Sequence, residues 1–194
     1  LYEKGLRNFI IERKAREKLI NKVRFLKKNK NLQFIEANII VVENAVVALQ
    51  KIAAHHRRKF DIPVIGITGS NGKTIVKEWL YHILRSQFNI IRSPKSYNSQ
   101  VGVPLSILQM NKHHTLAIFE AGISLPGEMA ALEDMIMPTL GLLTNIGTAH
   151  LENFESTNEL IHEKRTLFKK CQYIHIDDKG EFTDLHIEKQ GNHC

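Results

Sequence analysis

The residues that could do chemistry begin with a glycine-rich segment between an apolar run and a helix-forming run. Its sequence is Gly66-Ile67-Thr68-Gly69-Ser70-Asn71-Gly72-Lys73-Thr74. Small residues let backbone N–H groups turn inward around an anion, and a helix that begins here adds partial positive charge. Lys73 would reach the β- and γ-phosphates, and the Thr74 hydroxyl would hold Mg²⁺. The residues expected to bind the phosphates of a nucleoside triphosphate are Gly69, Ser70, Asn71, Gly72, Lys73 and Thr74.

The segment departs at one position from the common pattern G-x-x-x-x-G-K-[ST]. Ile67 stands where that pattern has its first glycine, and Gly66 and Gly69 lie on either side of it. An ordinary glycine-rich turn between a strand and a helix is the alternative interpretation. A Gly-Lys-Thr run soon after an apolar strand favours the phosphate loop.

Three further residues are candidates because of where they stand. Glu120 ends the apolar run 116–119, and in open α/β sheets that end of a strand faces the ligand crevice, where a carboxylate can bind Mg²⁺. His150 follows another expected strand end, and Lys164 lies in an expected helix. Taken alone, a surface or helix-capping Glu, a hydrogen-bonded loop His and a surface Lys are the alternatives.

The elements that must position these residues alternate between strand and helix after Pro63. Expected strands are 64–68, 90–92, 116–120, 140–145, 173–176 and 182–187; expected helices are 74–86, 104–110, 127–135 and 157–170. Before Asp61 the pattern predicts strands at 8–11 and 38–42 and helices at 13–30 and 45–60, with Asn44 as a helix N-cap. Such alternation implies parallel strands joined by right-handed crossovers. We therefore predict an α/β fold: a P-loop-type central parallel sheet with flanking helices, preceded by a partial, smaller α/β N-terminal domain.

Composition and charge exclude several classes of protein. The chain has 194 residues, is 43% hydrophobic and carries a net charge of +7. Residues 1–60 hold 15 Lys/Arg and 5 Asp/Glu, whereas residues 61–194 hold 12 and 15, so the basicity belongs to the first part. An apolar run long enough to cross a membrane is absent from the sequence. Two cysteines are too few for a disulfide framework, which favours a cytoplasmic protein. Because the sequence begins with Leu1 rather than Met, we expect a fragment of a longer chain.

Four blocks, in order, resemble the Mur ligases, the ATP-dependent amide-forming enzymes of peptidoglycan synthesis. The phosphate loop at 68–74 is the first of them. The others are the Asn…Gly-x-Pro segment at 98–104, the Glu-x-Gly strand end at 120–122 with Pro-Gly-Glu at 126–128, and the Asn…His-Leu block at 144–152, which Lys164 follows. The resemblance covers about residues 61–168 strongly, covers residues 1–60 weakly, and is not evident beyond Lys170.

The resemblance assigns roles to particular residues. It implies that Thr74, Glu120, His150 and Lys164 hold Mg²⁺, with Lys164 carbamylated so that its ammonium becomes a carboxylate-like ligand. It implies that Asn98 approaches the γ-phosphate beside Lys73. The catalytic set is then Lys73, Asn98, His150 and Lys164.

Some of the blocks favour the family member that acts on UDP-MurNAc-tripeptide and D-Ala-D-Ala. They are the Lys-Glu pair at 77–78, Gly-Val-Pro, Pro-Gly-Glu and Ala-His-Leu-Glu. We then expect residues 1–60 to be part of an N-terminal UDP-sugar domain and residues 61–194 an incomplete central ATP-binding domain, without a C-terminal domain. Such a fragment should bind Mg-ATP without turnover. In some bacteria a member of the family is fused to an alanine racemase, and no feature of this sequence suggests that part.

Two other functions stay open at this point. Within the superfamily, the alternatives are another Mur ligase or a folylpolyglutamate synthase-like ligase. From a different class, the basic run 13–30 would suit an NTPase module that binds nucleic acid, although only Phe25 supplies an aromatic ring for stacking there. We therefore expect neither nucleic-acid binding nor membrane insertion. A purely structural interaction domain would not need a phosphate loop.

Overall fold

The computed structural model of the protein describes residues 7–18, 38–147, 151–176 and 188–189. By its internal contacts the chain divides into two compact units, residues 1–49 and residues 50–194. Among the described residues, no helix combines the length and the apolarity that a membrane crossing requires.

The first unit contains two short parallel strands, β1 (Asn8–Glu12) and β2 (Asn38–Val42). The first was predicted at 8–11 from a short apolar run, and the second at 38–42 from its β-branched residues. The following helix, α2 (Ala45–Arg57), begins as expected at Asn44, whose side-chain oxygen accepts hydrogen bonds from the N–H groups of Val46 and Val47. Residues 13–18 of the predicted basic helix are helical, and the rest of that prediction lies outside the described residues.

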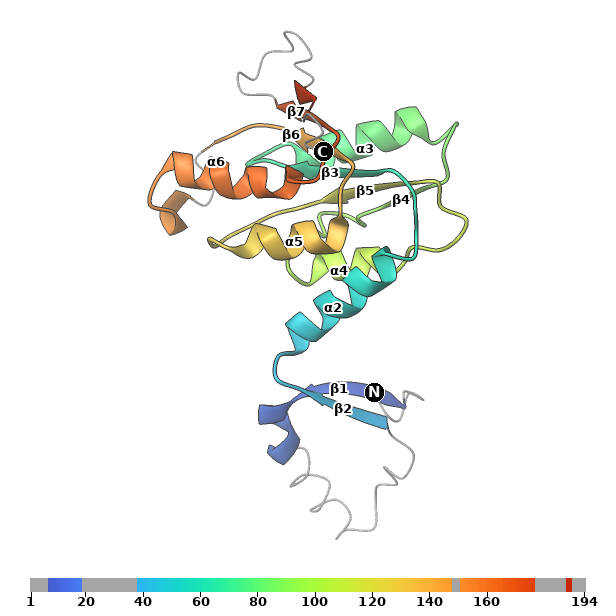
Figure 1. The fold of residues 1–194 in the computed structure, drawn as a ribbon, viewed down its shortest axis with the longest axis vertical. Coiled ribbons are helices and arrows are strands. Elements are labelled where there is room, and N and C mark those ends of the chain that lie inside the picture. The colour runs from blue at the N-terminus through green and yellow to red at the C-terminus, as the bar shows by residue number, and fades with distance from the viewer. Residues whose placement is uncertain (1–6, 19–37, 148–150, 177–187, 190–194) are drawn as a thin grey trace, which may run out of the picture. The chain divides into compact units, whose positions relative to one another are not determined.

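The second unit is built on a six-stranded sheet in the order β4-β5-β3-β6-β7-β8. Its first five strands are parallel and β8 pairs antiparallel with β7 (Figure 1). The strands are β3 (Val64–Thr68), β4 (Ile90–Arg92), β5 (Leu116–Glu120), β6 (Leu140–Leu143), β7 (Tyr173–Ile176) and β8 (Glu188–Lys189). The adjacent strands β3 and β5 are fully buried, which explains why their sequences are apolar runs rather than alternating patterns. The parallel α/β fold predicted from the sequence is confirmed.

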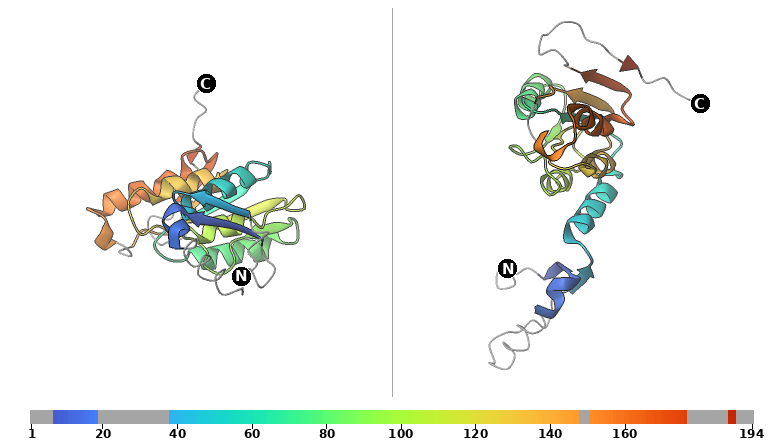
Figure 2. Two further views of the ribbon diagram at one scale, coloured as in Figure 1. Left: turned by 90° about the horizontal axis from the view of Figure 1, so that it is seen from below. Right: turned by 90° about the vertical axis from the view of Figure 1, so that its left-hand side faces the viewer.

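Helices cover both faces of this sheet, and Figure 2 shows them from two further directions. They are α3 (Lys73–Leu84), α4 (Gly102–Ile107), α5 (Glu128–Ile136) and α6 (Thr157–Arg165), with short 3₁₀ turns η2 (Leu151–Asn153) and η3 (Thr166–Phe168). Helix α3 packs with Val76, Leu80 and Leu84 on one apolar cluster of the sheet. The other helices share a second, larger cluster. The sheet is therefore held between two layers of helices, and its strand ends are left free to carry loops.

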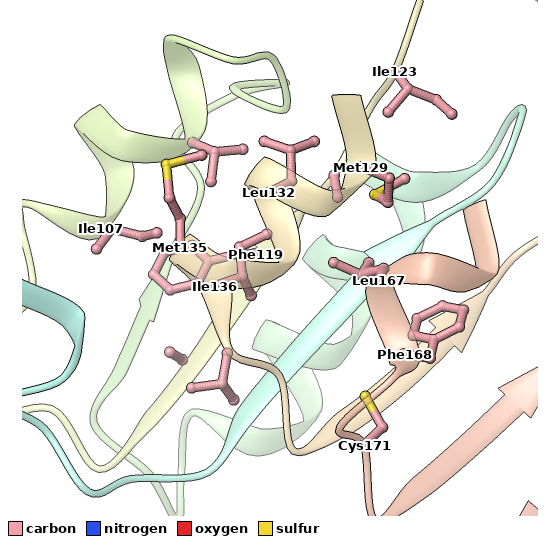
Figure 3. Packing of buried hydrophobic residues seen from close by; sticks show 14 of the residues in the cluster. Ile107, Phe119, Ile123, Met129, Leu132, Met135, Ile136, Leu167, Phe168 and Cys171 are labelled. Carbon is pink, nitrogen blue, oxygen red and sulfur yellow. The ribbon is translucent and has the colours of Figure 1, made fainter. Parts of the chain in front are cut away.

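The larger cluster lies between α5 and the sheet. Side chains of α5, Phe119 of β5, and Leu167 and Phe168 of η3 all belong to this cluster (Figure 3). Gly141 on β6 allows this approach, because a Cβ atom there would lie 2.4 Å from the Phe168 ring. The sheet of the second unit is thus packed on both faces, which keeps the ends of its strands in place.

Several predicted element boundaries differ from the structure. The helix predicted at 157–170 ends at Arg165 and continues as the 3₁₀ turn η3, where the Thr166 hydroxyl bonds back to the His162 carbonyl. The strand predicted at 140–145 ends at Leu143. The Thr144 N–H still donates to the Thr68 carbonyl of β3, but the Thr144 hydroxyl and the Asn145 side chain hydrogen-bond to the glycine-rich loop. The strand predicted at 182–187 lies outside the described residues.

Candidate functional site

The glycine-rich loop joins the C-terminal end of β3 to the first turn of α3. Gly69 and Gly72 both adopt positive φ, 144° and 81°, and Gly72 stands directly before the first helical residue, Lys73. Glycine adopts such angles at little cost, whereas other residues are strained there. The loop therefore reverses the backbone just where the free N–H groups of a helix start are available to an anion.

The segment that follows β6 holds the loop in this shape. The Ser70 N–H donates to the Asn145 carbonyl at 2.9 Å, and the Asn71 N–H donates to the Asn145 side-chain oxygen, also at 2.9 Å. The Thr144 hydroxyl donates to the Asn71 carbonyl, and the Gly147 N–H donates to the Ser70 hydroxyl at 2.9 Å. The loop is thus fixed by neighbours more than seventy residues away in sequence.

Two lysine ammonium groups converge on one carbonyl of the loop. Lys73 Nζ donates to the Gly69 oxygen at 2.7 Å, and Lys164 Nζ, on α6, donates to the same oxygen at 3.2 Å. Burial lowers the pKa of Lys73, an effect that Glu120 partly opposes. Burial and then the charge of Lys73 lower the pKa of Lys164 to about 8. A negatively charged group placed between these lysines would relieve both effects.

A second feature of the site is a pair of oxygen atoms suited to a divalent cation. The Thr74 hydroxyl donates to Glu120 Oε2 at 3.0 Å, and Glu120 is fully buried at the C-terminal end of β5. Mg²⁺ prefers oxygen ligands, takes few of them from protein and keeps water or phosphate oxygens in its other positions. The pair therefore fits Mg²⁺. Among the described residues there is no cluster of three or more His, Cys, Asp or Glu that could form a cage of protein ligands.

The loop that carries Asn98 reaches the same edge of the sheet. The Gly122 N–H, just after β5, donates to the Asn98 carbonyl at 2.8 Å. A Cβ atom on Gly122 would lie 3.0 Å from the Asn98 side-chain amide, so the absence of a side chain there gives the amide its room. Asn98 therefore stands at the strand end that also carries Glu120.

The structure thus brings most of the predicted site residues together at the C-terminal ends of β3 and β5. The residues placed there are Gly69, Ser70, Asn71, Gly72, Lys73, Thr74, Asn98, Glu120 and Lys164. Lys164 is 1% exposed and is not the surface lysine that composition alone would favour. Its unmodified amine contacts the loop carbonyl. His150 lies outside the described residues.

Three residues of the site were not assigned a role by the sequence analysis. Thr144 and Asn145, just after β6, fasten the loop, and the fully buried Lys77 on α3 forms an ion pair with Glu120 at 2.8 Å. Polar residues directly after an apolar strand were a usable signal for the first two. Lys77 had no usable local signal, because only the packing of α3 on the sheet decides that this lysine is buried.

The lowered pKa of Lys164 predicts a pH dependence of stability. Its pKa is about 8 in the folded protein and 10.5 as a free side chain. Below pH 8 Lys164 is charged in both states, so the folded state carries the full cost of the buried charge. Between the two pKa values only the unfolded chain binds the proton, and the free energy of unfolding therefore rises with pH. We expect Lys164→Met to remove this rise and to stabilise the ligand-free protein at pH 7 by about 2 kcal/mol.

This expectation can be checked by urea unfolding of both proteins from pH 7 to pH 10, with EDTA and without dissolved carbon dioxide. Lys73 contributes a rise in the same direction, so the quantity to follow is the difference between the parent and the variant. Lys112→Met, at an exposed lysine, serves as the control and should follow the parent at every pH. A difference between parent and Lys164→Met that does not change with pH would contradict the assignment.

Several relatives of the chain share one name. The chain is 43% identical over 111 residues to the UDP-N-acetylmuramoyl-tripeptide–D-alanyl-D-alanine ligase of Synechocystis sp.. It is 31% identical over 190 residues to the ligase of the same name from Borreliella burgdorferi. These alignments cover 57% and 98% of this chain but only 24% and 39% of the two relatives, so the chain spans a minor part of their length.

Solved structures agree with this similarity. The MurF ligase from Thermotoga maritima in complex with ADP matches 90% of this chain with a TM-score of 0.67 and 27% identity, over 43% of its own length. MurF from Acinetobacter baumannii matches 77% of the chain with a TM-score of 0.69 and 28% identity, over 34% of its own length. The Mur ligase middle domain itself matches residues 67–193. Because this domain spans most of the chain, and its phosphate loop lies at the end of a parallel strand, the chain belongs to the Mur ligase family.

Proposed function

We propose that this chain supplies the Mg-ATP site of a ligase that joins D-Ala-D-Ala to UDP-MurNAc-tripeptide. The observation that carries the proposal is the convergence of Lys73 and Lys164 on the Gly69 carbonyl, beside the Thr74–Glu120 oxygen pair. The Lys73 ammonium group suits a polyphosphate, and the hydroxyl–carboxylate pair suits a bound Mg²⁺. The names of the most similar relatives support the choice of substrates.

The reaction would proceed through an acyl phosphate. A carboxylate oxygen of the tripeptide attacks the γ-phosphorus and ADP leaves; the amine of D-Ala-D-Ala then attacks the acyl carbon, phosphate leaves and a proton is released. Phosphoryl transfer of this kind needs positioning and charge neutralisation more than covalent help. Mg²⁺, when bound, neutralises charge on the phosphate oxygens.

The residues of this chain have separate tasks in that scheme. Lys73 would hold the phosphates, and Thr74 and Glu120 would hold Mg²⁺. Asn98, in the loop between β4 and α4, would orient the γ-phosphate. The sheet keeps these groups at fixed positions, because Glu120 and the loop start are buried strand ends. Placing reacting groups in line in this way is the main contribution that the protein can make.

We also propose that Lys164 is carbamylated in the working enzyme and that His150 shares the metal site with it. In carbamylation the neutral amine adds to carbon dioxide, an N–C bond forms and a proton is released. The buried position of Lys164 beside Lys73, with no carboxylate among the hydrogen-bond and ion-pair partners described for it, supports an anionic modification. Mass spectrometry of the intact protein in bicarbonate would detect the added carbon dioxide, and Lys164→Met should not take it up.

The chain organisation completes the proposal. We assign residues 1–60 to part of an N-terminal domain for the UDP-sugar substrate and residues 61–194 to the central ATP-binding domain, and we place the reaction in the cytoplasm, where ATP is available. The first part is basic, which suits an anionic UDP-sugar as well as it suits any other anion. The alanine racemase fusion stays a prediction about residues outside this sequence.

Isothermal titration tests the nucleotide site directly. The chain is expected to bind the non-hydrolysable ATP analogue AMP-PNP with Mg²⁺, more tightly than without Mg²⁺, and to show no turnover of ATP by itself. A folded sample that binds no nucleotide would defeat the proposal.

The substrates are tested with the longer protein that contains this chain. Release of phosphate from ATP should require both UDP-MurNAc-tripeptide and D-Ala-D-Ala. Release that instead requires a different amino acid with a shorter UDP-MurNAc-peptide, or a folate with glutamate, would replace the proposed reaction with one of the alternatives from the sequence.

A further inference from the structure

Lys77 is a buried cation to which the proposed function gives no task. It lies on α3 one turn after Thr74 and is 0% exposed. A buried ammonium group is costly unless it is paired and hydrogen-bonded, so its partners indicate why the fold keeps it.

Lys77 Nζ forms an ion pair with its neighbour on α3, Glu78, at 3.2 Å, and its other partners belong to two separate parts of the site. Its Nζ lies 2.8 Å from Glu120 Oε1, the carboxylate oxygen that does not face Thr74. The same Nζ donates to the Ser93 carbonyl at 2.8 Å and to the Lys95 carbonyl. Lys77 therefore connects the end of β5 to the first residues of the loop that carries Asn98.

The backbone at these positions is arranged around the ammonium group. Lys95 adopts φ 51°, in the left-handed region, which is unfavourable for a residue other than glycine. Such strain persists where the surroundings compensate it, and a charge-assisted hydrogen bond to the Lys95 carbonyl is a compensation of this kind. In addition, the Ser93 hydroxyl accepts a hydrogen bond from the Glu120 N–H at 3.2 Å, which joins the start of the loop directly to the strand end.

We propose that Lys77 is a positioning residue for the Mg-nucleotide site. By occupying Oε1 of Glu120 it leaves only Oε2, beside Thr74, for the metal ion, and by binding the two loop carbonyls it keeps Asn98 at the same edge. Lys77 touches neither ligand itself. The inference rests on the proposed function, because it concerns the same Mg-nucleotide site.

The test compares AMP-PNP affinity with and without Mg²⁺ in the parent chain and in Lys77→Met. Methionine keeps most of the apolar stem and removes the charge. We expect the gain in affinity that Mg²⁺ gives to fall by about 10-fold or more, since one misplaced ligand of a charged site has an effect of this size. Affinity without Mg²⁺ should stay within about twofold, because the phosphate loop and Lys73 are unchanged.

Arg57→Met is the matched control for the loss of a buried cation. Arg57 is 5% exposed, and its guanidinium donates to the carbonyls of Phe60, Ile136 and Met137. These carbonyls lie shortly before β3 and β6 begin, at the opposite end of the strands from the site. It should lower the melting temperature without changing the effect of Mg²⁺. If Arg57→Met reduces the Mg²⁺ effect as much as Lys77→Met does, general loosening of the fold explains both and the inference is overturned.

A second variant covers the case in which Lys77→Met does not fold. Lys77→Gln keeps two N–H donors in a neutral group, and a smaller but clear reduction of the Mg²⁺ effect is expected from it. A folded Lys77→Met or Lys77→Gln with the parent's full Mg²⁺ effect would overturn the inference and leave the proposed function intact. A folded parent chain that binds no nucleotide would overturn both.

Discussion

Replacing Lys73 with methionine is expected to lower the affinity of the chain for Mg–AMP-PNP by about 100-fold, or about 2.7 kcal/mol. The Lys73 ammonium group is half-buried within the phosphate loop, where charge–phosphate interactions are stronger than in water. Methionine removes the charge and keeps a stem of similar length. Titration calorimetry of both proteins measures the difference.

Two controls separate lost binding from lost structure. The melting temperature of ligand-free Lys73→Met should equal or exceed that of the parent, because burial lowers the pKa of Lys73 and its charge is therefore unfavourable in the folded protein. Lys112→Met, at an exposed position, should bind the nucleotide as the parent does. A folded Lys73→Met that retains the parent's affinity would mean that the loop does not bind phosphates.

Gly69→Ala is expected to lower the free energy of unfolding of the ligand-free protein by about 3 kcal/mol. Gly69 has φ 144°, and a Cβ atom there would lie 2.0 Å from the Thr144 hydroxyl and 3.1 Å from backbone atoms of Asn145. The hydroxyl cannot move aside without giving up its hydrogen bond to the Asn71 carbonyl. Chemical unfolding of the ligand-free protein measures this loss.

Gly127→Ala is the matched control, because it isolates backbone strain from steric clash. Gly127 also has a positive φ, 83°, but a Cβ atom there would meet no atom within 4 Å. It should cost only about 1 kcal/mol. Adding Thr144→Ala to Gly69→Ala should recover part of the lost stability, since it removes the nearest clashing atom. Equal losses for Gly69→Ala and Gly127→Ala would show that the contact with Thr144 is unimportant.

Local patterns were sufficient to predict most of the described elements of the second unit, but not β8 or η2. Fully buried strands such as β3 and β5 read as apolar runs, and the glycine-rich loop between β3 and α3 is recognisable because only small residues can turn the backbone around an anion. Both signals depend on neighbours in sequence. Element ends were predicted less well, as at Leu143 and Arg165, because contacts with distant residues decide where a strand or helix stops.

The sequence by itself determined the phosphate loop, the α/β alternation and the carboxylate at the end of β5, since each is a property of residues within a few positions of one another. The tertiary structure alone decided that Lys164 is buried against Gly69, that Thr144 and Asn145 fasten the loop, and that Lys77 pairs with Glu120. These contacts join residues that are far apart in the chain. A lysine in a helix has the same local pattern whether it faces water or a carboxylate, and only the packing of the helix on the sheet distinguishes the two.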